Sequence, residues 1–131
     1  MWYSLRATGF IFRTSFMDRP YELLIVGGGP AGVAAGVYAS RKRLQTAFVT
    51  KEWGGQSTVS ADIQNWIGTP SISGNQLADD LKSHLEAYAG DCVDITADQI
   101  VTKLDKTESG YQVTLSDDSV HKARAILIAS G

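Results

Sequence analysis

The stretch IVGGGPAGVAAG, residues 25–36, decides the fold of this chain. It places Gly27, Gly29 and Gly32 at the spacing G-x-G-x-x-G. The apolar run ELLIV, residues 22–26, leads into the first glycine and is typical of a strand buried on both faces of a parallel sheet. The segment VAAGVYASRKR, residues 33–43, follows the last glycine of this spacing, and its small residues and basic end are typical of a helix. A glycine fingerprint between a strand and a helix predicts a site for the phosphates of a dinucleotide.

The residues of the fingerprint have separate steric roles. Gly27 allows a tight turn out of the strand, whereas a side chain at Gly29 would keep a pyrophosphate away from the backbone amides. Gly32 and Gly36 allow close packing of the helix on the sheet, and Pro30 suits the first helical turn. The helix N-terminus then offers unpaired N–H groups and positive potential to an anion. The residues expected around the phosphates are Gly27, Gly28, Gly29, Pro30, Ala31 and Gly32.

The run QTAFVT, residues 45–50, is the second predicted strand. In the usual fingerprint, an Asp or Glu about 20 residues after the glycines binds the ribose hydroxyls. Here the strand ends at Val49 and Thr50, with Glu52 just beyond. This departure argues against an ordinary NAD dehydrogenase, and it leaves open which of Thr50 and Glu52 holds the sugar.

The segment KEWGGQSTVSADIQNW, residues 51–66, has no sustained helical or strand period and is predicted to be a polar loop. Such a loop would cover a ligand that extends past adenosine and pyrophosphate, as the flavin of FAD does; a solvated surface loop is the alternative. Its GGQ part supplies backbone amides and the Gln56 side chain, and Asn65 supplies a second amide. Trp53 and Trp66 are equally suited to pack on a cofactor or on the core.

The remainder predicts one helix and a small β-sheet. In SGNQLADDLKSHLEAYAG, Leu77, Leu81 and Leu85 share a face, Ser73 or Asn75 is placed to cap the helix, and Gly90 ends it. The runs CVDI, DQIVTKLDK, YQVTLSD and SVHKARAILIAS are predicted strands. The expected fold is an α/β domain interrupted by a β-meander. His84, His121 and the pair Asp79–Asp80 are expected on the surface, and no residue is predicted to be catalytic or to bind metal.

The motifs GGGPAG, GGQS, DIQNWIG, SGNQLADDLKSHL and ILIASG resemble, in this order, the low-molecular-weight thioredoxin reductases and the flavoprotein subunit of alkyl hydroperoxide reductase. The resemblance covers Tyr21 to Gly131. It implies a Rossmann-like FAD-binding domain of the type with two dinucleotide-binding folds, with Asn65 beside the isoalloxazine ring. Beyond the glycine fingerprint, the residues that it implies at FAD are Thr50, Lys51, Glu52, Gly54, Gly55, Gln56, Asn65, Ala129, Ser130 and Gly131.

The resemblance implies that the chain is truncated before an NAD(P)H-binding domain with a Cys-x-x-Cys pair. The full-length protein would be an NAD(P)H-dependent flavoprotein disulfide reductase that passes electrons to a thioredoxin- or peroxiredoxin-type disulfide, and a homodimer stays open. This chain alone is not expected to be a competent reductase, because hydride transfer needs both cofactors held together. The alternatives are a ferredoxin–NADP reductase-like flavoprotein without a dithiol, a non-catalytic flavin-binding remnant, and, disfavoured by GGQ, the NAD-binding domain of a dehydrogenase.

Bulk properties narrow the remaining classes. The 131 residues suffice for one domain, and a net charge of −2 provides no basic field for nucleic acid. No apolar run reaches the roughly 18 residues that span a membrane. The single cysteine, Cys92, excludes an internal disulfide and is expected to be a small apolar strand residue. Residues 1–17 are expected to be a leader or, preferably, a misassigned start, with the FAD-binding domain over 18–131 and a cytoplasmic location favoured over organelle targeting.

Overall fold

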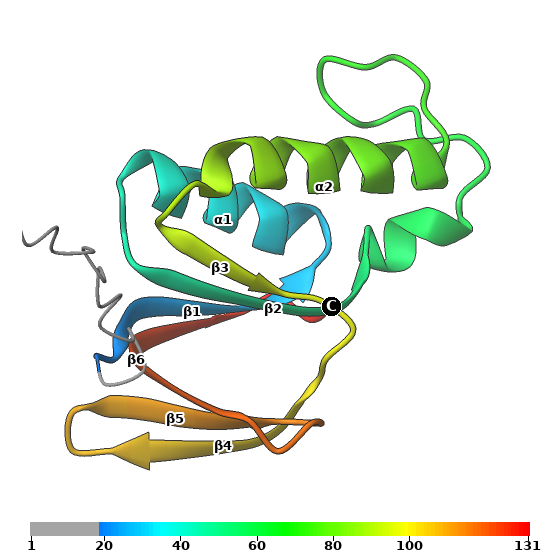
Figure 1. Ribbon diagram of the computed structural model, residues 1–131. Coiled ribbons are helices and arrows are strands. Elements are labelled where there is room, and N and C mark those ends of the chain that lie inside the picture. Colours follow the sequence, from blue (N-terminus) through cyan, green and yellow to red (C-terminus); the bar gives the residue numbers. More distant parts are fainter. Residues whose placement is uncertain (1–18) are drawn as a thin grey trace, which may run out of the picture.

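The computed structural model describes residues 19–131, so the expected leader at 1–17 lies outside the described residues. Its elements alternate between strands and helices before the meander (Figure 1). They are β1 (Tyr21–Gly28), α1 (Pro30–Arg41), β2 (Thr46–Trp53), the 3₁₀ helix η2 (Gly55–Val59), α2 (Gly74–Ala89), β3 (Val93–Thr96), β4 (Val101–Thr107), β5 (Gly110–Leu115) and β6 (Val120–Ile128). Every strand and helix expected between residues 21 and 128 is therefore present.

A single six-stranded sheet has the order β3-β2-β1-β6-β5-β4. Strands β2, β1 and β6 pair in parallel, as do β2 and β3, whereas β4, β5 and the start of β6 pair antiparallel. The small sheet expected from the sequence is therefore not a separate one, because the meander, formed by β4, β5 and the first half of β6, continues the parallel sheet. The reason is the length of β6, whose first half pairs with β5 and whose second half pairs with β1.

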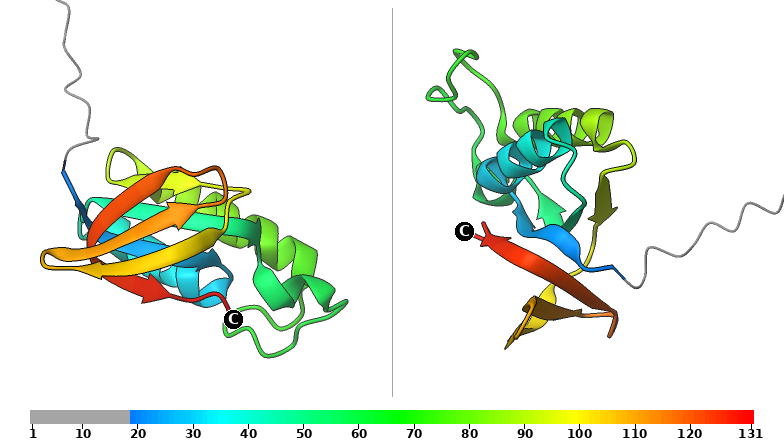
Figure 2. Two further views of the ribbon diagram at one scale, coloured as in Figure 1. Left: turned by 90° about the horizontal axis from the view of Figure 1, so that it is seen from below. Right: turned by 90° about the vertical axis from the view of Figure 1, so that its left-hand side faces the viewer.

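The two faces of the parallel strands are covered by different elements. Helices α1 and α2 lie on one face, and β4 and β5 turn across the other (Figures 1 and 2). Because side chains alternate along a strand, Ile25 of β1 packs under the helices while its neighbour Leu24 faces the meander. The helix-side core also contains Phe48 and Leu85, and the meander-side core contains Val49, Val113, Leu115 and Ala123.

Helix α2 forms as its sequence predicts. Ser73 is the N-cap, and its hydroxyl accepts a hydrogen bond from the Gln76 amide at 3.2 Å. Leu77, Leu81 and Leu85 are buried, and Gly90 ends the helix. None of the helices in the described part of the chain combines the length and apolarity that a membrane crossing requires. Cys92 is buried, as expected, but it lies in the turn just before β3 and not in the strand itself.

Part of the segment that was predicted as an irregular loop forms regular secondary structure. Strand β2 continues through residues 51–53, and η2 follows it. Pairing of Trp53 with Gly28 extends the strand although the local sequence has no strand period. The Trp53 ring stacks on Phe48, with centroids 5.6 Å apart and planes at 10°, so this tryptophan belongs to the core.

Candidate functional site

The carboxyl ends of β1, β2 and β6 meet at one edge of the sheet, where a cavity of about 800 Å³ opens. It lies where ligands bind to open α/β sheets. The glycine fingerprint, the ends of β2 and β6, the start of η2 and the inner side of the meander form its wall. Of the residues predicted at a cofactor, all but Gly32 and Asn65 line this cavity.

The glycine fingerprint forms a cradle that is open toward the cavity. Gly27 has φ +121°, and a Cβ at this position would collide with the Ala129 carbonyl oxygen. Gly29 is the N-cap of α1 and Pro30 begins the helix. A Cβ at Gly29 would meet its nearest heavy atom, the Gly54 oxygen, only at 4.0 Å. The space in front of the helix N-terminus is therefore free for a phosphate, whose charge the N–H groups there would stabilise.

Gly32 supports this cradle from behind. A Cβ there would collide with the Gly27 carbonyl oxygen, so the helix approaches the strand closely, as predicted. Gly36 contributes differently, because a Cβ there would lie 2.8 Å from Cδ1 of Leu85 on α2. Because Gly36 has no side chain, α1 can pack closely against α2 and also against Phe48 of the sheet.

The end of β2 carries a bulge beside the cradle. Val26 pairs with Val49 and Gly28 with Trp53, so two steps along β1 correspond to four along β2. Thr50 is 3% exposed. Its hydroxyl donates to the Glu52 carbonyl oxygen at 2.6 Å, within the bulge. Lys51 and Glu52 are exposed at the cavity.

The GGQ segment, residues 54–56 at the start of η2, forms the wall of the cavity beside the end of β2. Gly54 donates its N–H to the Gly28 carbonyl at 2.9 Å. A Cβ at Gly55 would lie 3.6 Å from Cα of Gly29, so the start of η2 lies against the cradle. Thr58 donates to the Gly55 carbonyl at 2.9 Å and holds the short helix in this position. Gln56 is exposed at the cavity wall, where its amide is free to reach a ligand.

The end of the chain contributes backbone to the same site. The Ala129 N–H donates to the Val26 carbonyl at 2.7 Å, which places residues 129–131 next to the glycine turn. Ala129, Ser130 and Gly131 all line the cavity, and their contact with FAD, which the resemblance implies, stays a prediction.

The apolar wall of the cavity was missed from the sequence. Its lining includes Ile100, Val101 and Leu104 from the meander side, together with Val113. Ile100 and Leu104 are 46% and 44% exposed, which leaves large apolar side chains open to a ligand beside the cavity. The sequence predicts the strands, but which of their side chains turn toward the cofactor edge depends on how the meander folds across the sheet.

Asn65 is placed elsewhere. It is exposed in the connection between η2 and α2, where Ile63 and Ile72 pair in an isolated bridge. Asp62 accepts hydrogen bonds from Ser71 and Gln64, both at 2.6 Å, and these bonds hold the pKa of Asp62 below its usual value. The role of Asn65 beside a flavin stays a prediction.

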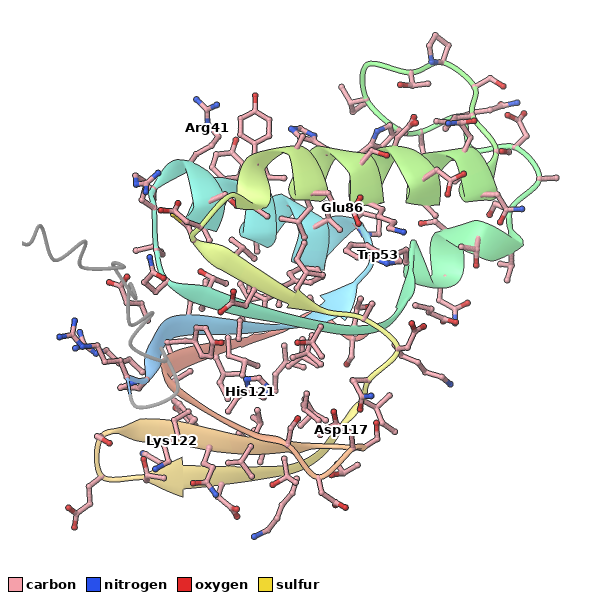
Figure 3. All side chains as sticks on the ribbon, viewed as in Figure 1. Arg41, Trp53, Glu86, Asp117, His121 and Lys122 are labelled. Carbon is pink, nitrogen blue, oxygen red and sulfur yellow. The ribbon has the colours of Figure 1, made fainter. Side chains whose placement is uncertain are left out.

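The predicted surface groups lie away from the cavity. His84 is exposed on α2, with its ring centroid 5.4 Å from that of Tyr88. His121 lies in the first half of β6 and is half-buried, not exposed as expected, with its ring centroid 6.0 Å from that of Tyr21 (Figure 3). Burial raises the pKa of the Cys92 thiol, which keeps it protonated. Within residues 19–131, the cavity therefore has binding groups but no histidine or cysteine in its lining.

Comparison with known proteins points to one family. The family model described as pyridine nucleotide-disulphide oxidoreductase matches residues 21–131. The F subunit of alkyl hydroperoxide reductase in Staphylococcus epidermidis is 35% identical over 119 residues, which cover 90% of this chain and 23% of that protein. The Escherichia coli K12 protein of the same name is 40% identical over 114 residues, which cover 85% of this chain and 21% of that protein.

Solved structures lead to the same family. Thioredoxin reductase from T. acidophilum superposes with a TM-score of 0.75 at 30% identity, covering 87% of this chain and 36% of that one. The thioredoxin reductase of Streptococcus pyogenes MGAS5005 superposes with a TM-score of 0.74 at 34% identity, and the match covers 85% of this chain and 35% of that one. The chain spans 21–23% of the length of the curated relatives described above. The resemblance read from the motifs is confirmed, and the chain belongs to the pyridine nucleotide-disulphide oxidoreductase family.

Proposed function

We propose that this chain is the FAD-binding portion of an NAD(P)H-dependent flavoprotein disulfide reductase. One observation carries the proposal: the open cradle at Gly29 continues directly into a cavity of about 800 Å³ with an apolar wall. Phosphates alone would need only the cradle. A planar ring system joined to a pyrophosphate would use both parts, and the volume lies within the range of cofactor sites.

The residues suit FAD in a definite order along the cavity. The amides at the N-terminus of α1 would hold the pyrophosphate beside Gly29. The exposed carboxylate of Glu52 is available to accept from ribose hydroxyls, and Lys51 lies beside it. The Gln56 amide and the backbone of residues 129–131 would bond polar atoms of the cofactor farther along the edge. Asn65 would join them only if its loop reached the ring.

When bound, FAD would supply the chemistry of accepting a hydride and passing an electron pair to a disulfide. The residues of this chain bind and orient it, and the apolar meander wall excludes water from one side. The only cysteine of the chain, Cys92, is buried outside the cavity. The dithiol of the full-length protein would therefore lie outside this sequence, and by analogy with the relatives we propose the same for the nicotinamide site.

Relatives named as alkyl hydroperoxide reductase and thioredoxin reductase favour the dithiol branch over the ferredoxin–NADP type. By analogy, the electron acceptor of the full-length protein is proposed to be a thioredoxin- or peroxiredoxin-type disulfide. A homodimer, a cytoplasmic location and the absence of a nucleic-acid partner belong to the same proposal. A flavin-binding remnant is the rival, and reductase activity of the full-length protein distinguishes the two.

Titration of the purified chain with FAD and, separately, with NAD tests the binding. We expect saturable binding of FAD, read by the change in flavin fluorescence or by calorimetry, and weak or no binding of NAD. Preferential binding of NAD would replace the proposal with the dehydrogenase alternative.

The matched variants are Gly29→Val and Ala34→Val. Gly29 has φ −77° and open space around its Cβ position, so valine fits the backbone and fills only the cradle. Ala34 is exposed on the same helix and outside the cavity. We expect Gly29→Val to abolish FAD binding with the fold retained, and Ala34→Val to bind normally. Equal affinities would show that FAD does not use the cradle.

A further inference from the structure

Thr50 occupies the point where the cavity walls meet. It is buried, and its hydroxyl donates to the Glu52 carbonyl at 2.6 Å. A threonine has a single proton to donate, and this one is already used. With 3% of the residue exposed, little of its surface is left for a sugar to contact. The ribose role that the sequence left open between Thr50 and Glu52 therefore falls to Glu52.

The hydrogen bond of Thr50 spans the bulge in β2. Four steps of β2, from Val49 to Trp53, lie opposite two steps of β1. A bulge bends its strand and changes the direction of side chains, which is why bulges occur beside active sites. Lys51 and Glu52 are exposed here although residues 46–50 of the same strand are all buried. The hydroxyl thus braces the backbone that turns Glu52 outward.

Thr50 also contacts the other walls of the cavity. A Cβ at Gly28 would collide with the Thr50 hydroxyl, so this side chain packs directly against the glycine cradle. The Gly28 carbonyl in turn accepts from the Gly54 N–H. On the meander side, the Gln99 N–H donates to the Thr50 carbonyl at 3.2 Å. Thr50 thus contacts the cradle, the bulge and the segment that leads into the meander directly, whereas η2 is linked to it only through Gly28.

We propose that Thr50 is a positioning residue for the adenosine end of the cofactor. Its hydroxyl holds the bulge so that Glu52 presents its carboxylate to the ribose, and it makes no bond to the sugar itself. The inference rests on the proposed FAD-binding function and deepens it. The role differs from a direct ribose contact in a measurable way, because a positioning residue acts only through Glu52.

The experiment measures ADP and FAD binding by calorimetry for the wild type, Thr50→Val, Thr50→Ser, Glu52→Gln and the double variant Thr50→Val/Glu52→Gln. Loss of the hydroxyl leaves the Glu52 carbonyl without this partner. We therefore expect Thr50→Val to weaken both ligands about tenfold, equivalent to ~1.4 kcal/mol. Thr50→Ser keeps the hydroxyl and should restore affinity. The double variant should lose no more than the larger single loss, because coupled residues are not additive.

Thr46→Val is the matched control. Thr46 is buried in the same strand, and its hydroxyl likewise donates to a backbone carbonyl, that of Leu44 at 2.9 Å, but it lies outside the cavity. We expect normal ligand affinity for this variant. Thr50→Ala replaces Thr50→Val if the latter fails to fold.

Hydrogen exchange of the ligand-free chain supplies a second readout. The Gly54 and Gln99 amides should exchange faster in Thr50→Val and return to normal in Thr50→Ser, while amides of the core strands stay protected. Unchanged affinity and exchange in Thr50→Val, or additive losses in the double variant, would overturn the positioning role. Failure of the wild type to bind either ADP or FAD would instead overturn the proposed function.

Discussion

The two faces of the parallel sheet are closed in different ways. On the helix face, α1 and α2 cover β1 and β2, and Ile25, Phe48 and Leu85 are fully buried. On the other face, β5 packs Val113 and Leu115 over the sheet, but the edge that carries the cavity stays open. The helix face therefore provides stability, and the meander face provides both a core and one wall of the candidate binding site.

The sharpest test of this difference is to remove a side chain from the helix face. Leu85→Ala should lower the free energy of unfolding by about 2–5 kcal/mol, because it leaves a cavity among fully buried side chains. Chemical denaturation measures the loss. A change below about 1 kcal/mol would mean that the helix face is loosely packed, since that is less than the removed methyl groups contribute.

Adding volume to the same face should also destabilise the chain. Gly36→Val places methyl groups against Leu85 and Phe48, and we expect a loss of about 1–3 kcal/mol. Ala34→Val, exposed on the same helix, is the control and should cost only the small helix-propensity difference. Thermal unfolding compares the two. Equal melting temperatures would show that the helices can separate without cost.

On the meander face, we expect a substitution to change ligand affinity more than the free energy of unfolding. Leu104 lines the cavity and is 44% exposed, so Leu104→Ala should change the free energy of unfolding by less than about 1 kcal/mol. FAD affinity should fall severalfold, because part of the apolar wall is removed. Val120→Ala, an exposed site of the meander outside the cavity, should leave affinity unchanged. Equal effects of both variants would remove the meander from the site.

The smallest effect is expected at high pH, at Tyr21, which packs against the meander-side core. Burial raises the pKa of Tyr21 to about 12, and its hydrogen bond to Asp94, at 2.8 Å, acts in the same direction. Because the folded-state pKa is raised, its stabilising contribution is full below pH 10 and is lost as pH rises toward 12. Tyr21→Phe should abolish this part of the pH dependence. Tyrosinate absorbance and the free energy of unfolding, measured between pH 10 and 12, test this prediction. Identical pH profiles for the wild type and Tyr21→Phe would contradict the raised pKa of Tyr21.

Local sequence was sufficient where one residue type dictates the backbone. The glycine spacing with Pro30 predicted the strand, turn and helix around the cradle, because glycine readily adopts the conformation of Gly27 and only an absent side chain leaves the space at Gly29 open. The leucine period and the Ser73 cap predicted α2 for similarly local reasons. Other candidates, such as residues 129–131, came from the family resemblance, and they line the cavity because strand ends in a parallel sheet meet at one edge.

Pairing between distant segments decided the rest. Contact with β1 extended β2 to Trp53, and the stacking of Trp53 on Phe48 assigned this tryptophan to the core. The double pairing of β6 joined the meander to the parallel sheet and turned Ile100 and Leu104 toward the cavity. Residue types and short spacings thus determined the glycine cradle, because its constraints act within a few residues. The apolar wall and the bulge at Thr50 depend on which strands meet, and only the tertiary structure decides that.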